Sequence, residues 1–366
     1  MKIKQFSVFV GAVSLMSALT PAAAQQPQPE QIPSTELTQT IITPVMEVPI
    51  VPGKNLIYCS TFQIAWNMLQ DTVGGRIEME GQPEIVDLLN RRLSTTKDIS
   101  EDCYEAACGE PSPDFWDSLY RRLTDKFGQN APPRTKERNY PPGDAIVCYA
   151  YLFKGLYFPE AFDTLGSPII FRSAPDSAGV KAFGREGYSP DGVLHDLANQ
   201  VTIVDYKDDD DFMISLKSKS EADEIILAKT SPRRTLLKTI EYVEGKINKS
   251  DNLPLPNSAI LKIPKIDFNI FHRVKELIGR SFLNKGWQDW WIEDAYQWIR
   301  FLLNEKGVEL KSEAVILALR GVGHGPPPMR LVFDRPFLIY LKQKDAKYPY
   351  FAMWVDNAEL MVKSGQ

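Results

Sequence analysis

Few residues of this chain have the types and spacing that enzyme chemistry requires. The 366 residues include three histidines, His195, His272 and His324, and none belongs to an HExxH zinc-protease pattern. The sequence contains no G-x-S-x-G nucleophile elbow and no phosphate-binding P-loop. We therefore expect no enzymatic activity, no catalytic residue, no metal site and no cofactor. A hydrolase of unrecognised type remains open, because catalytic triads are assembled in space and not in sequence.

The cysteines are the next candidates for chemistry. Cys103 and Cys108, in the segment CYEAAC, are close enough in sequence to predict a local disulfide. Cys59 and Cys148 lie in apolar segments, and two predictions stay open for them: buried free thiols, or a second disulfide. The acidic run DYKDDDD at 205–211 lacks the spacing of an EF-hand calcium loop. We predict the exposed tip of a β-hairpin there.

The start of the chain has the pattern of an export signal. Lys2 and Lys4 precede an apolar run from Phe6 to Leu19, and three alanines before Gln25 supply a cleavage pattern. We predict a signal peptide over 1–24, a flexible Gln/Pro-rich leader over 25–52 and a single domain over 53–366. The protein is expected to be secreted or periplasmic, without a membrane span. Loss of both lysines would lower the net charge from −5 to −7, which argues against nucleic acid as a partner.

A long connection near the C-terminus separates two apolar segments. It runs from Glu305 to Arg330, far beyond the roughly 4–6 residues of an ordinary loop. Apolar or small residues alternate with charged ones in its first half, which is the pattern of a strand with one buried face. The residues on the predicted buried side are Val308, Leu310, Ser312, Ala314, Ile316 and Ala318. The segment is thus able to form a strand, although its position predicts a loop.

This combination resembles the serpin family. The resemblance lies in EKGVE at Glu305–Glu309, in FDRPFLIYL at Phe333–Leu341 and in the final aromatic strand YFAMWVDN at Tyr350–Asn357. The segment DAIVCYAYLFKGLYF, beginning at Asp144, is similar to a central strand of the serpin main sheet. The chain looks like a serpin of bacterial type with a shortened N-terminal half.

The resemblance implies a fold and a mechanism. The fold would be α+β, with a large central β-sheet, additional sheets, packed helices and a reactive-centre-like loop that is either exposed or inserted. A secreted serine or cysteine protease inhibitor of this family is cleaved in its loop, and the cleaved loop inserts as a strand and traps the protease. The expected partner is therefore a protein, with a protease as the candidate that this mechanism implies, and a monomer is favoured. Counting along the family pattern from Glu305 implies a reactive bond near Gly321–Val322, and Arg320–Gly321, one bond earlier, is the better chemical bait for a trypsin-like pocket. The pattern also implies a hinge made of Glu305, Lys306, Gly307, Val308, Glu309, Leu310, Ser312 and Ala314.

Two departures from the family keep a second function open. Inhibitory serpins have small residues after the hinge, whereas this chain has Leu310, Lys311 and Glu313. The region between Cys59 and Asp144 is also shorter than in the family. The alternative is a non-inhibitory serpin-like binding or structural protein with an inert or pre-inserted loop.

Overall fold

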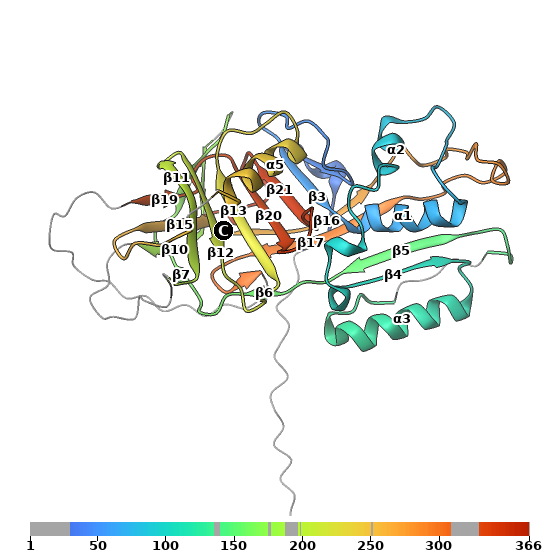
Figure 1. The fold of residues 1–366 in the computed structure, drawn as a ribbon, viewed down its shortest axis with the longest axis horizontal. Coiled ribbons are helices and arrows are strands. Elements are labelled where there is room, and N and C mark those ends of the chain that lie inside the picture. Colours follow the sequence, from blue (N-terminus) through green and yellow to red (C-terminus); the bar gives the residue numbers. More distant parts are fainter. Residues whose placement is uncertain are drawn as a thin grey trace, which may run out of the picture.

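The fold is described from a computed structural model of the chain, in which residues 30–134, 140–174, 177–186, 197, 199–249, 252–308 and 329–365 are described. Strands form several separate sheets, and helices pack on them (Figure 1). The predicted α+β class is confirmed. The described helices are α1 (Thr61–Val73), α2 (Glu84–Leu89), α3 (Pro113–Phe127) and α5 (Leu236–Ile247), with 3-10 turns η1 (Ser34–Glu36), η2 (Thr96–Asp98), η3 (Glu101–Cys103) and η4 (Gly128–Asn130).

The largest sheet in the described part of the chain has eight strands, drawn from both ends of the sequence. Its order is β14 (Leu253–Pro254), β11 (Val201–Asp208), β12 (Asp211–Leu216), β13 (Asp223–Lys229), β20 (Phe337–Gln343), β21 (Phe351–Val355), β3 (Asn55–Cys59) and β2 (Thr40–Thr43). The hairpin of β11 and β12 has the acidic run at its tip, as predicted.

The centre of this sheet is covered on both faces. One face packs on α5, whose Leu236, Ile240 and Val243 contact the cluster that contains Trp354. The opposite face packs against the other sheets in the main core. Because both faces are buried, the central strands are continuously apolar instead of alternating, as in the FAMWV run of β21.

Smaller sheets surround the large one. They are β19 (Arg330–Val332)–β15 (Ile260–Pro264)–β10 (Ala182–Glu186)–β7 (Asp163–Thr164); β1 (Ile32–Pro33)–β16 (Ile266–Arg273)–β17 (Tyr296–Leu303); β4 (Tyr104–Gly109)–β5 (Val147–Leu152); β6 (Leu156–Tyr157)–β18 (Gly307–Val308); and β8 (Ile169–Arg172)–β9 (Ser177–Val180). Strand β17 alternates strictly between inward residues such as Ile299 and Phe301 and outward residues such as Tyr296.

Two helices enclose the antiparallel pair of β4 and β5. Helix α3 starts at a Ser112 cap, whose hydroxyl accepts from the Phe115 amide at 3.2 Å. Its Leu119 and Leu123 pack against Tyr149 and the other aromatic residues on one face of the pair. Helix α1 packs on β4 and β5 and also contacts β17 (Figure 1). The β4–β5 pair therefore lies between α1 and α3.

The prediction of a flexible leader over 25–52 is wrong for the described residues from 30 onward. Strands β1 and β2 lie within it, and Ile42, Thr43 and Met46 are buried. The cause is a polar network that no local pattern reveals: the Glu359 carboxylate accepts from the Gln39 amide at 3.1 Å and from the Thr40 hydroxyl at 2.7 Å. These bonds dock the segment on the last turn of the chain.

The predicted disulfide between Cys103 and Cys108 is also wrong. Cys108 is bonded to Cys148, across the register of β4 and β5, while Cys103 and Cys59 are free and buried. Strand pairing brings Cys108 opposite a residue that is 40 positions away in sequence. Of the two predictions for Cys59, the buried thiol is confirmed, whereas Cys148 belongs to a bridge.

Candidate functional site

The candidate site begins with two strand edges. Strand β17 is at the edge of its sheet, and β5 belongs to a two-stranded sheet, so within the described residues neither strand has a sheet partner on its outer side. Helix α1 packs on both strands. The two edges therefore lie against the same helix.

The hinge follows β17 directly and pairs with β6, the strand after β5. Strand β17 ends at Leu303, and a tight turn follows in which the Asn304 amide donates to the Gly307 carbonyl at 3.1 Å. The chain then pairs with β6, with Gly307 opposite Tyr157. Only glycine fits at 307: its φ is +122°, and a Cβ atom would lie 2.3 Å from the Leu156 carbonyl oxygen. This accounts for the glycine of the EKGVE motif.

A buried ion pair holds the start of the hinge. The Glu305 carboxylate lies 2.6 Å from the Lys265 ammonium, and both side chains are largely buried. The Glu305 carbonyl accepts from the Phe162 amide at 2.8 Å, and the Lys306 carbonyl accepts from the Phe158 amide at 2.9 Å. Removal of either side chain would leave the other as an unpaired buried charge, so Lys265 and Glu305 are each needed to stabilise the other. The turn is thus anchored from three directions before the chain reaches 309.

The far end of the connection is anchored by a second buried cation. Strand β19 pairs in parallel with β15, and the residues after it contact Lys229, which is 3% exposed. The Lys229 ammonium donates to the Val332 carbonyl at 3.0 Å and to the Asp334 carboxylate at 2.8 Å. It also lies 2.9 Å from Asp210 on the acidic hairpin. Lys229 therefore joins the end of β13, the hairpin tip and the returning chain.

The structure describes only part of the predicted site. Glu305, Lys306, Gly307 and the backbone of Val308 are brought together in the hinge. The remaining predicted residues lie outside the described residues: Glu309, Leu310, Ser312, Ala314, Arg320, Gly321 and Val322. Sequence reasoning missed Lys265 and Lys229. Lys229 carried one signal, since a lysine ending an apolar strand requires an acidic partner when it is buried.

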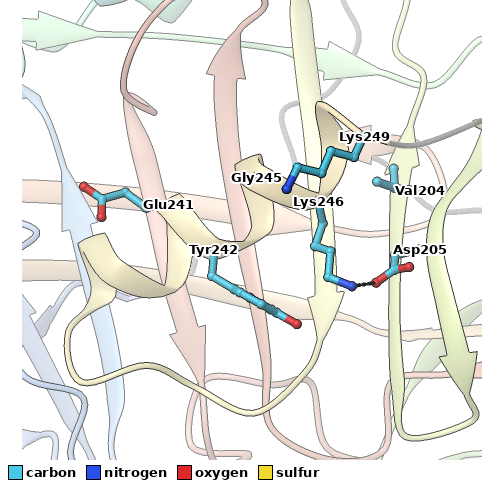
Figure 2. A pocket seen from close by; sticks show the side chains of 7 residues that line it. All are labelled: Val204, Asp205, Glu241, Tyr242, Gly245, Lys246 and Lys249. Atoms are coloured by element: carbon cyan, nitrogen blue, oxygen red, sulfur yellow. Dashed lines mark ion pairs between the residues drawn. The ribbon is translucent and has the colours of Figure 1, made fainter.

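A groove between β11 and α5 is a weaker candidate (Figure 2). Asp205 and Lys246 line it, and their charged groups form an ion pair at 2.9 Å. Tyr242 also lines it, and the Arg233 guanidinium lies 3.8 Å from the centre of that ring. Since Asp205 and Lys246 satisfy each other, the groove offers no buried polar group aimed at a ligand.

No protein-family model and no curated protein matches the chain. Among solved structures, the chain is similar to thyroxine-binding globulin in complex with thyroxine, with 13% identity over 83% of this chain and 93% of that one and a TM-score of 0.49. It is also similar to Serpin48 of the insect Tenebrio molitor, with 11% identity over 83% and 92% and a TM-score of 0.47. A human thyroxine-binding globulin structure gives 12% identity over 83% and 92% and a TM-score of 0.47.

At these identities and TM-scores, the likeness assigns no family, activity, ligand or partner to this chain. In the described part of the chain, no helix is long and apolar enough to span a bilayer, and no group of three or more His, Cys, Asp or Glu residues is arranged to hold a metal ion.

Proposed function

We propose that this protein is an exported, serpin-like inhibitor of serine or cysteine proteases, which acts by cleavage of its loop and insertion of the cleaved strand. The observation that carries the proposal is the pair of strands β5 and β17, whose outer edges have no strand partner among the described residues; the hinge follows β17 and pairs with β6, the strand after β5. The connection that leaves this hinge has the alternating pattern of a half-buried strand. A segment able to form a strand is therefore attached next to two edges that the described part of the chain leaves unpaired.

The register of the proposed insertion follows from bonds already present at the hinge. Asn304 and Gly307 form an antiparallel β-bridge. If the same pairing continued along β17, Leu310 would lie opposite Phe301 and Ser312 opposite Ile299. Residues directly opposite in an antiparallel pair point to the same face. Phe301 and Ile299 are buried, so Leu310 and Ser312 would be buried as well.

The other edge leads to the same assignment independently. Leu156 of β6 pairs with Val308, and continuation of that ladder places Leu152 opposite Ser312 and Ala150 opposite Ala314. Leu152 and Ala150 both pack against the main core. Both edges thus select the even-numbered residues as the buried face, which is also the face that the sequence pattern selects. The charged residues Glu309, Lys311 and Glu313 would face outward.

The bait would be the bond between Arg320 and Gly321. An arginine side chain suits the acidic specificity pocket of a trypsin-like protease. The next bond, between Gly321 and Val322, is the alternative in the family pattern. Cleavage at either bond frees the strand to insert, and the trapped state would be kinetic, because the uncleaved loop is held away from its most stable position.

One observation favours the second function, a non-inhibitory binding protein. Insertion must bury Leu310 beside Phe301, where inhibitory serpins place a small residue. A larger side chain slows insertion, and slow insertion lets a protease complete hydrolysis. In that case the loop would be cleaved without trapping.

The test mixes the purified protein with trypsin-like and subtilisin-like proteases and analyses the products on denaturing gels. We expect a band at the summed mass that survives boiling. Leu310→Arg should abolish this band, because it would bury an unpaired charge at a cost of several kcal/mol. Glu313→Arg, on the outward face, is the matched control and should retain it.

Other outcomes decide against inhibition. A clean cut after Arg320 with the protease still active would show a substrate and not an inhibitor. A large rise in melting temperature of that cut product would show slow insertion, whereas no rise would leave the binding-protein function. Loss of the band in both variants would refute the register.

A further inference from the structure

A cluster outside the proposed site places a thiol against an amine. Lys154 lies between β5 and β6, and Cys103 ends the 3-10 turn η3 just before β4. The Lys154 Nζ atom is 2.9 Å from the Cys103 Sγ atom. The two residues are 51 positions apart in sequence, and the Phe153 amide, which donates to the Cys103 carbonyl at 3.0 Å, holds their backbones together.

Each of the two groups also has its own carboxylate. The Asp223 Oδ2 atom is 2.7 Å from Lys154 Nζ, and the Asp223 side chain is only 1% exposed. The Cys103 thiol donates to Asp102 Oδ1 at 3.2 Å. Tyr350 fixes Asp223 from the other side, since its hydroxyl donates to Oδ1 at 3.2 Å. The sulfur and the nitrogen are therefore adjacent, and each has a proton acceptor in contact.

The resting protonation states follow from this arrangement. Burial, together with Asp102, raises the pKa of the Cys103 thiol against the opposing effect of Lys154, so the thiol is the resting form. Hydrogen bonds from Ser100 and Cys103 lower the pKa of Asp102, which is therefore ionised, and the adjacent Lys154 ammonium is the group that favours the thiolate needed for attack. Burial favours a neutral Lys154, but Asp223 and Cys103 outweigh it and raise its pKa.

We propose that Cys103 and Lys154 form a covalent sulfur–nitrogen bond, a sulfenamide, when the protein meets a peroxide. The chemistry follows from a known reaction of cysteine, in which a sulfenic acid condenses with a backbone nitrogen to a sulfenamide; here the Lys154 Nζ atom takes the place of the backbone nitrogen. Exported proteins meet oxidising conditions, and the bond would join the turn before β4 to the segment between β5 and β6. The inference does not depend on the proposed protease inhibition.

The reaction balances in two steps. The Cys103 sulfur attacks hydrogen peroxide, the O–O bond breaks, and a sulfenic acid and one water form; sulfur loses two electrons and the peroxide gains them. Lys154 then loses a proton to Asp223, its nitrogen attacks the sulfenic sulfur, and the S–O bond breaks with release of a second water. In total, a thiol, an ammonium and hydrogen peroxide give a sulfenamide, two waters and a proton.

Cys59 provides an internal comparison. It is the other free cysteine of the described residues, it is buried, and its Sγ atom has the Thr61 hydroxyl at 3.8 Å instead of an amine. Burial raises its pKa too. If burial alone governed the outcome, Cys59 and Cys103 would respond alike to peroxide.

The test treats the full-length protein with hydrogen peroxide, digests it with trypsin without reduction and analyses the peptides by mass spectrometry. The peptides that contain Cys103 and Lys154 are already joined by the Cys108–Cys148 disulfide, so a joined mass alone decides nothing. Two readouts are decisive. The mass of the disulfide-joined peptides should fall by that of two hydrogen atoms, and trypsin should no longer cut after Lys154. Dithiothreitol should restore that cut.

Two variants complete the test. In the Cys103→Ser variant, trypsin should still cut after Lys154 when the protein has been treated with peroxide. Lys154→Arg retains the charge beside Asp223, and in it Cys103 should stop as a sulfenic acid that dimedone captures. The proposal is overturned if Cys103 of the unmodified sequence becomes sulfinic acid with the cut after Lys154 intact, stays unoxidised, or pairs with Cys59. A bridge that contains an additional oxygen atom would overturn the sulfur–nitrogen assignment.

Discussion

Replacement of Gly307 by alanine tests the geometry of the hinge most directly. The residue has φ +122°, and an added Cβ would lie 2.3 Å from the Leu156 carbonyl oxygen and 2.7 Å from the Tyr157 Cα atom. Both atoms belong to the backbone of β6, so no side-chain rotation relieves the clash. The substitution therefore strains residue 307 and separates β18 from β6.

The magnitude is the sum of two effects. A non-glycine residue at positive φ costs about 1–2 kcal/mol. Forcing backbone apart to admit one carbon costs a further ~1–3 kcal/mol, as for other overpacked sites. We expect Gly307→Ala to lower the free energy of unfolding by about 2–5 kcal/mol, the sum of these two ranges.

Gly74→Ala is the matched control. Gly74 ends α1 at φ +89°, and a Cβ there would meet no atom within 4 Å. It should lose only the backbone part, about 1–2 kcal/mol. Urea unfolding of both variants measures the difference, and faster tryptic cutting after Lys306 would show that β18 has detached. Equal losses in the two variants would refute the clash with β6.

Three further predictions concern other anchors. Lys229→Met should lower the free energy of unfolding by about 1–3 kcal/mol, because the Val332 carbonyl and Asp334 lose a buried charged donor while Arg172 still pairs with Asp334; Lys207→Met, whose side chain is 72% exposed, should change it by under about 0.5 kcal/mol, and similar losses would contradict the anchor. Burial lowers the pKa of His272 below its ordinary value, so the folded state binds its proton less well than the unfolded chain does. Stability from this residue is fully present above about pH 6.5, the unfolded pKa, and is lost as the pH falls below that value through the lower pKa of the folded state; His272→Asn should weaken the decline between pH 7 and 5 in urea titrations, and an unchanged decline would exclude the histidine. Asn55→Ala leaves two buried backbone amides unpaired, so we expect a loss of about 2–4 kcal/mol and new proteolytic cuts within residues 30–52; resistance of that segment to protease would argue against the docking network.

The sequence by itself determined the features that depend on neighbours along the chain. The apolar strands β20 and β21, the β11–β12 hairpin and helices α3 and α5 follow from local periodicity and turn chemistry. The EKGVE segment was recognised from the sequence as a hinge, whereas the reason for its glycine, the nearby Leu156 carbonyl, comes from the structure. These features could be predicted because each depends on residues within one turn or strand.

Only the tertiary structure decided which distant residues meet. The 25–52 segment was predicted as flexible from its composition, yet Glu359 docks part of it from the other end of the chain. Cys108 pairs with Cys148 because β4 and β5 bring them opposite each other, and Lys265 and Lys229 reach their carboxylates by the same kind of long-range contact. The physical reason is that periodicity specifies which face of a strand is buried, whereas its partner depends on the closure of long loops, which no local pattern encodes.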